Sequence, residues 1–161
     1  MKNLLITFLI GLVSAASAAA PEDEVIYLGD HFREYWEVKK TQRPVYPQNL
    51  LKERAMGCAL VGFIIETNGK VSTVEPLSAF PNGAFATAAR NAVRKWRFKP
   101  TQANTDPFPT YALQNIVFRL EGAGIKKAPP TEEINQICWD AAQRRIAERT
   151  GQAPSDLGAT D

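Results

Sequence analysis

The chain has 161 residues, of which 45% are hydrophobic and 22% are charged, and its formal net charge is +2. This length suits one domain with an ordinary core and some peripheral elements, not two independent domains. The composition is that of a soluble globular protein, and so small a charge gives no reason to expect nucleic acid as a partner.

The first 18 residues have the pattern of a secretory signal peptide. Lys2 supplies the positive charge, residues 4–13 form the apolar run, and residues 16–18 read Ala-Ser-Ala, a small-x-small cleavage site. We therefore predict cleavage after Ala18 and a mature chain without a membrane span. An uncleaved anchor is the competing interpretation, but a spanning helix needs about 20 apolar residues and this run is shorter.

The lead segment, residues 19–42, contains an aromatic cluster of Phe32, Tyr35 and Trp36. The spacing of these three residues suits a helix, whereas the alternation of apolar and polar residues from Trp36 to Lys39 suits a strand. Both readings stay open. Such a cluster usually packs on its own domain, and a ligand platform is the less common alternative.

Residues 43–47, Arg-Pro-Val-Tyr-Pro, predict an extended entry into a short helix, because the second proline can occupy a first helical turn. Residues 48–56 contain good helix formers, and Gly57 offers a left-handed stop. A strand over residues 58–67 then runs into Asn68-Gly69, a strong hairpin signal, so we expect residues 70–77 to be its antiparallel partner.

An amphipathic helix is predicted next, ended by Pro100. Its buried stripe consists of Phe85, Ala88, Ala89, Ala92, Val93 and Trp96. Its basic face, read as solvated, consists of Arg90, Arg94, Lys95 and Arg97. After a polar loop, residues 111–120 form a third strand with one apolar face.

A final helix is predicted over residues 132–149, with Thr131 as N-cap and Gly151 as stop. Its apolar stripe consists of Ile134, Ile137, Cys138 and Ala141. In an exported chain the cysteines Cys58 and Cys138 favour a disulfide, with two buried free thiols as the alternative. A linker precedes this helix and a small polar tail follows it, within residues 123–161.

No pattern for catalysis, a cofactor or a metal is present. The chain has one histidine, His31, and no nucleophile-elbow, phosphate-loop, metalloprotease or paired-cysteine motif. We therefore predict neither an enzyme nor a cofactor or metal site. An enzyme or small-ligand binder would require polar groups to converge in a pocket, and no spacing in the sequence obliges them to do so.

Binding of another protein needs no unusual residues. Three strands backed by one helix leave sheet edges, to which an extended peptide can add itself as another strand. The last strand, from residue 113 onwards, is the expected open edge. The candidate partner-binding residues there are Leu113, Gln114, Asn115, Ile116, Val117, Phe118, Arg119 and Leu120. Such edges could also pair two copies, so a homodimer is a further expectation.

Five features, in this order, give residues 43–122 a resemblance to the C-terminal domain of the TonB family. They are residues 43–47, a glycine and phenylalanine at 57 and 63, Thr-Asn-Gly-Lys-Val at 67–71, the alanines of the amphipathic helix, and Trp-Arg-Phe-Lys-Pro at 96–100. The resemblance implies a small α+β domain in the periplasm that recruits the N-terminal TonB-box strand of an outer-membrane receptor, and it adds Arg43 and Tyr46 to the candidate contacts.

Two departures weaken the role of force transmission that the family resemblance implies. A transducer needs an inner-membrane anchor and a long spacer, whereas only about two dozen residues separate the predicted cleavage site from Arg43. Arg43 also replaces a glutamine common at this position in the family. We therefore predict a soluble periplasmic binding module linked to transmembrane transport, with a short membrane-anchored energy transducer as the alternative.

The expected fold is a three-stranded antiparallel ββαβ sheet, preceded by a short helix. The family pattern assigns Ala59, Val61, Phe63 and Ile65 to the helix-covered core. The other face of this strand is also apolar, so a disulfide to Cys138 would place the final helix across it. Gly62 would permit the close approach of that helix.

Overall fold

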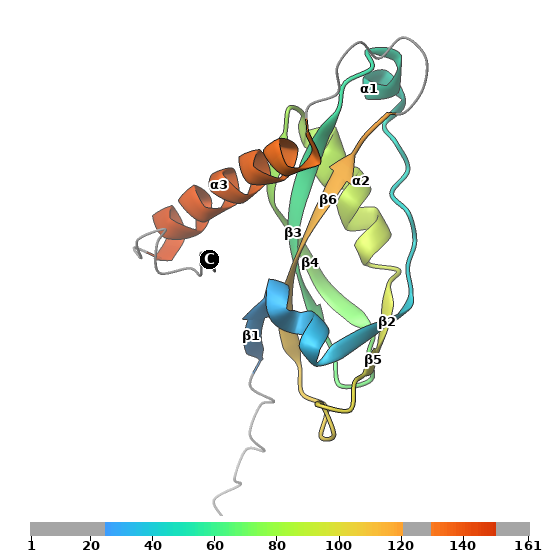
Figure 1. Cartoon of the computed structure of the whole chain (residues 1–161), viewed down its shortest axis with the longest axis vertical. Coiled ribbons are helices and arrows are strands. Elements are labelled where there is room, and N and C mark those ends of the chain that lie inside the picture. Colours follow the sequence, from blue (N-terminus) through green and yellow to red (C-terminus); the bar gives the residue numbers. More distant parts are fainter. Residues whose placement is uncertain (1–24, 121–129, 151–161) are drawn as a thin grey trace, which may run out of the picture.

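The computed structural model describes residues 25–120 and 130–150 (Figure 1). Its elements are β1 Ile26–Gly29, the 3-10 helix η1 Asp30–Glu34, β2 Trp36–Lys40, α1 Gln48–Lys52, β3 Gly57–Ile65, β4 Val71–Phe80, α2 Gly83–Val93, β5 Arg97–Pro100, β6 Thr110–Phe118 and α3 Thr131–Thr150. The predicted signal peptide and its cleavage site, the linker over 121–129 and the Gly151 stop lie outside the described residues.

The main sheet has four strands in the order β1-β6-β3-β4, and β2 and β5 form a separate two-stranded sheet. The predicted α+β class and the β3–β4 hairpin are confirmed, as is the antiparallel pairing of β3 with the last strand. The predicted count of three strands is wrong. Three strands are additional: β1 and β2 come from the lead segment, β5 follows α2, and β1 pairs with β6 while β2 pairs with β5.

The aromatic cluster of the lead segment belongs partly to a helix and partly to a strand. Phe32 lies in η1 and Trp36 begins β2, and each is 1% exposed. The Trp36 indole donates a 2.8 Å hydrogen bond to the Thr110 hydroxyl, so its polar group is satisfied inside the core. Phe32 and Trp36 therefore pack on their own domain and form no exposed ligand platform.

The predicted end of the first helix is wrong. Helix α1 stops at Lys52, and Arg54, with φ of 52°, takes the left-handed conformation expected of Gly57. Gly57 instead begins β3, where a Cβ would lie 1.8 Å from the Phe80 carbonyl oxygen, so glycine is required for close strand contact.

The amphipathic helix α2 ends at Val93, and Arg97 of the predicted basic face begins β5. The expected buried stripe is confirmed at Phe85, Ala89, Ala92 and Val93, whereas Ala88 is partly exposed. Pro100 ends β5 and not the helix, because β2 supplies β5 with a strand partner that lies far away in the sequence.

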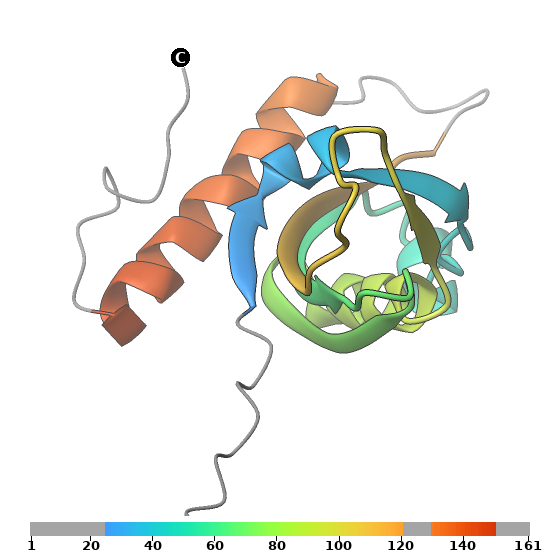
Figure 2. The ribbon, with the colours of Figure 1, turned by 90° about the horizontal axis from the view of Figure 1, so that it is seen from below.

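Alternate residues of β3 enter two cores on opposite faces of the sheet. Val61, Phe63 and their neighbours face α2. Leu60 and Cys58 face α3, where Cys58 is disulfide-bonded to Cys138 with a Cα–Cα distance of 6.1 Å. Figure 2 shows α3 on the outer side of the curved sheet, away from α2.

The inner stripe of α3 consists of Ile134, Cys138 and Ala142, whereas the predicted Ile137 and Ala141 are only partly buried. Gly62 does not accommodate this helix. A Cβ at Gly62 would lie 2.0 Å from the Tyr111 hydroxyl oxygen, so the glycine makes room for the tyrosine ring.

Candidate partner-binding site

Strand β6 is paired on both sides at its start and on one side farther along. Strand β1 runs parallel to it, with Ile26 opposite Thr110, Tyr27 opposite Tyr111 and Gly29 opposite Ala112. Beyond Ala112, no strand within the described residues pairs with the side of β6 that faces away from β3. The stretch without a second strand partner therefore begins at Leu113, the first residue of the predicted edge, and η1 packs beside it.

The backbone groups that face this side follow from the pairing of β1. The Ile26 N–H donates a 2.9 Å hydrogen bond to the Pro109 carbonyl, which therefore points toward β1. Because alternate residues of a strand point their backbone groups to the same side, those of Leu113, Asn115 and Val117 also point away from β3. One of these acceptors is already used, since the Gln114 side-chain amide donates to the Asn115 carbonyl at 2.7 Å.

A small cavity of about 240 Å³ adjoins this stretch, between η1, β6 and α3. Arg33 donates a 2.6 Å hydrogen bond to the Gln114 side-chain oxygen, and Asn115 donates at 3.1 Å to both oxygens of Asn135. The side-chain oxygen of Asn115 is buried and has no hydrogen-bond partner in the described part of the chain. A ligand that supplies an N–H or O–H group here would satisfy it.

The other predicted residues of β6 divide between the two cores. Phe118 is 5% exposed, and its ring stacks on Phe85 with centroids 4.4 Å apart. Ile116 packs on the same core, whereas Leu113 and Val117 pack on the α3 side. Their side chains hold the fold, so a partner at this edge would contact mainly their backbone.

The last two predicted edge residues lie beyond the end of β6. Arg119 is exposed, and its guanidinium donates a hydrogen bond to the Thr131 hydroxyl at the start of α3. Leu120, which follows it, is partly exposed. The strand that could receive a partner is therefore two residues shorter than predicted.

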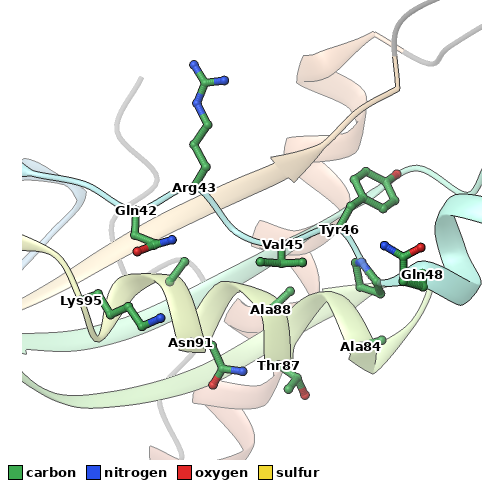
Figure 3. A pocket seen from close by; sticks show the side chains of 12 residues that line it. Gln42, Arg43, Val45, Tyr46, Gln48, Ala84, Thr87, Ala88, Asn91 and Lys95 are labelled. Atoms are coloured by element: carbon green, nitrogen blue, oxygen red, sulfur yellow. The ribbon is translucent and has the colours of Figure 1, made fainter.

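Arg43 and Tyr46 line a separate open groove of about 540 Å³ between the 42–48 segment and α2 (Figure 3). Tyr46 is structural: its hydroxyl donates to the Ala55 carbonyl at 2.5 Å, and its ring packs edge-on against Phe85 and Phe118. Burial raises the pKa of this hydroxyl. Arg43 points away from α2 in Figure 3, and Val45 is 74% exposed at the groove.

The structure does not bring the two groups of predicted contacts into one cavity. The groove holds Arg43 and Tyr46, the small cavity holds Leu113, Gln114 and Asn115, and the two share no lining residue. The sequence did not predict the other residues that line the small cavity, which are Asp30, Phe32, Arg33, Asn135 and Trp139. No local signal could have found them, because η1, β6 and α3 meet only through long-range packing.

Two further findings concern the described part of the chain. None of its helices combines the length and the apolar character needed to cross a membrane. Within residues 25–120 and 130–150, no three His, Cys, Asp or Glu side chains are grouped so that they could hold a metal ion.

Residues 42–120 match the family model described as Gram-negative bacterial TonB protein C-terminal. The chain therefore carries a TonB C-terminal domain. This segment contains the groove and all of β6, whereas β1, η1, β2 and α3 lie outside it. The strand that covers the start of β6 and the helix that covers the outer face are thus additions to the matched domain.

Solved and curated relatives agree with this assignment. Protein TonB of Salmonella typhimurium is 34% identical over 80 residues, which are 50% of this chain and 31% of that protein. Protein TonB of Escherichia coli is 31% identical over 80 residues, which are again 50% of this chain and 31% of that protein. The solution structure of the Pseudomonas aeruginosa TonB C-terminal domain has a TM-score of 0.50 and 25% identity, covering 60% of this chain and 94% of that one. The match thus spans about a third of the length of the curated relatives.

Proposed function

We propose that this chain is a periplasmic TonB-like module that binds an envelope protein, linked to transmembrane transport through an outer-membrane receptor. The partner adds an extended segment as a strand beside residues 113–118 of β6. The observation that carries the proposal is the one-sided pairing of this stretch in a TonB C-terminal domain. Six residues of strand offer an edge of about 20 Å, enough for a short peptide.

The geometry sets conditions on the added strand. It must lie beyond β1, where Gly29, with φ of 57°, ends the strand and leads into η1, and it must pass η1, which packs beside β6. It must also displace the Gln114 side chain from the Asn115 carbonyl. A partner N–H can replace that bond, so the exchange costs little, and a polar partner side chain fits the cavity lined by Arg33, Asn115 and Asn135.

A pair of substitutions at Asn115 tests whether backbone pairing holds the partner. A photoreactive residue at Gln114 should trap an outer-membrane protein in cells. Asn115→Pro removes the outward N–H and should abolish the adduct, whereas Asn115→Ala keeps that N–H and should preserve it. Thermal melting of both variants checks that the domain remains folded.

The proposal fails if Asn115→Pro leaves the adduct unchanged. It also fails if the same protein is trapped equally well from Thr73, an exposed residue on β4 at the opposite edge of the sheet.

The alternative of a membrane-anchored transducer rests on the apolar run over residues 4–13. N-terminal sequencing of the protein recovered from cells separates the two roles. A chain that begins at Ala19 supports the exported module, and a chain that retains residues 1–18 supports the transducer.

A further inference from the structure

A second surface, distant from the β6 edge, gathers positive charge around a groove of about 450 Å³. It lies where the β2–β5 sheet meets the β3–β4 turn, at the end of the molecule opposite α1 (Figure 1). The groove is lined by Lys39, Lys40, Asn68, Lys70, Arg97 and Phe98, here called the basic groove. Among the residues that the structure describes, no carboxylate lines it.

The four cations of the basic groove are Lys39, Lys40, Lys70 and Arg97. None of them forms an ion pair within the described residues, whereas the neighbouring Lys99 is paired with Glu37 at 3.0 Å. Arg97 is anchored by one nitrogen, since its Nη1 donates to the Trp96 carbonyl at 2.6 Å. Its Nε and Nη2 groups donate to no described residue, so part of its planar donor fork is available to a ligand.

The backbone brings these residues together in two ways. The β2–β5 register passes from Val38 opposite Phe98 to Lys40 opposite Arg97, so Lys39 is an extra residue in β2. Such a bulge redirects side chains, and here both lysines line the same groove.

The third cation is positioned through the Asn-Gly turn. The Phe98 N–H donates to the Gly69 carbonyl at 2.8 Å, and Lys70 bridges to Arg97. A Cβ at Gly69 would lie 2.0 Å from the Phe98 carbonyl oxygen, so glycine permits this contact. Asn68 is also fixed, because its Oδ1 accepts the Lys70 N–H at 2.9 Å, and its amide nitrogen donates to no described residue.

We propose that the basic groove binds a phosphate group, carried by a small molecule or by a lipid headgroup. A phosphate oxygen can accept from the Arg97 fork while other oxygens accept from the lysines and from the Asn68 amide. Phosphate fits better than a single carboxylate, because it offers more acceptor oxygens and up to two charges to a groove with four cations. This site is independent of strand addition at β6.

Titration of the exported chain with inorganic phosphate, followed by NMR at constant ionic strength, tests the proposal. The Gly69 and Lys70 amide signals should shift saturably. The double variant Lys39→Gln/Lys40→Gln should weaken binding by about tenfold or more. The charge-matched control Lys52→Gln/Arg90→Gln, which lies outside the groove, should stay within about twofold of the parent because solvent screens distant charges. Arg97→Lys keeps the charge, loses the fork, and should also weaken binding.

Vesicles of phosphatidylglycerol separate the two sources of phosphate. Vesicle binding that inorganic phosphate inhibits, and that phosphatidylcholine vesicles do not reproduce, assigns the site to a lipid headgroup. Phosphate binding without vesicle binding assigns it to a small molecule. The proposal is overturned if phosphate causes no shift, if acetate causes the same shifts, or if the two double variants weaken binding equally.

Discussion

The two faces of the sheet are stabilised differently. Among the described residues, the α2 side holds fourteen buried ones, many of them aromatic, with Phe63 in ring contact with Phe32, Trp96 and Phe98. The α3 side holds seven described residues that are buried, and two of them are the bonded cysteines. In Figure 1 the C-terminal part of α3 extends beyond the sheet. Apolar burial is thus extensive on one side, and a covalent tether supplements a small core on the other.

This difference follows the boundary of the matched domain. Twelve of the fourteen buried residues described on the α2 side lie within residues 42–120, the exceptions being Phe32 and Trp36, whereas α3 lies outside that range. The α2 core should therefore govern global unfolding, and the α3 layer should be able to open locally while the rest stays folded. The following predictions test that separation.

The largest effect is expected from Phe63→Ala in the α2 core. Phe63 is fully buried, so its removal should lower the free energy of unfolding by about 3–5 kcal/mol. Ile134→Ala, in the α3 core, should cost about 2 kcal/mol, since the disulfide still holds the helix. Urea unfolding measures both. Equal costs would mean that the two layers form one cooperative core.

The second-largest loss of stability is expected when the disulfide is removed. The variant Cys58→Ala/Cys138→Ala should lose up to about 4 kcal/mol, the chain-entropy value for so long a loop. Hydrogen exchange should rise first in α3 and much less in β3. Reductant should reproduce the effect in the parent chain and have none in the double variant. A uniform rise in exchange across the sheet would contradict local opening.

Much of the α2 side could be predicted from the sequence, because its signals are local. The helical spacing of Phe85, Ala89 and Val93 and the Asn68-Gly69 turn each act within a few residues. The alternation of apolar side chains along β3, together with the two cysteines, also predicted that α3 lies across the face of the sheet opposite α2. Strands β1, β2 and β5 could not be found in this way, because they are short and exist through pairing between distant segments.

The candidate site was predicted less completely for the same reason. Residues 113–118 were identified from strand order alone, but Arg33 and Asn135 reach the edge through the packing of η1 and α3. Tyr46 was expected to contact a partner, and its hydroxyl and ring are instead engaged within the domain. A motif can locate a residue without revealing which of its groups remain available.

A smaller effect is expected from a substitution at Gly62, which lies beside the ring of Tyr111. In Gly62→Ala the new methyl would displace Tyr111, whose hydroxyl donates to Glu75 at 2.8 Å and whose ring stacks on Tyr27. We expect a loss of about 1–3 kcal/mol, as for other overpacked sites, and faster hydrogen exchange in β1.

Gly83→Ala is the matched control, since nothing lies within 4 Å of a Cβ there, and it should leave stability nearly unchanged. Unaltered exchange in β1 of the Gly62→Ala variant would show that the tyrosine stack does not hold this strand on β6.

The smallest effect is expected on the free energy of unfolding at high pH, through Tyr46 on the α2 side and Tyr27 on the α3 side. Burial raises the pKa of Tyr46 above its ordinary value of 10.0, and partial burial together with the charge of Asp30 raises the pKa of Tyr27, which is 55% exposed. As the pH rises past 10.0, the unfolded chain releases these protons before the folded chain does, so the free energy of unfolding falls until the folded groups also ionise.

Tyr46→Phe should cost about 1 kcal/mol at neutral pH through loss of its hydrogen bond to Ala55. In urea unfolding across this alkaline range, the variant should lose less stability than the parent, and the double variant with Tyr27→Phe should lose least. If Tyr46→Phe retains the full alkaline decline while the Tyr27 variant does not, the linkage lies on the α3 side alone, and the Tyr46 hydroxyl is as accessible folded as unfolded.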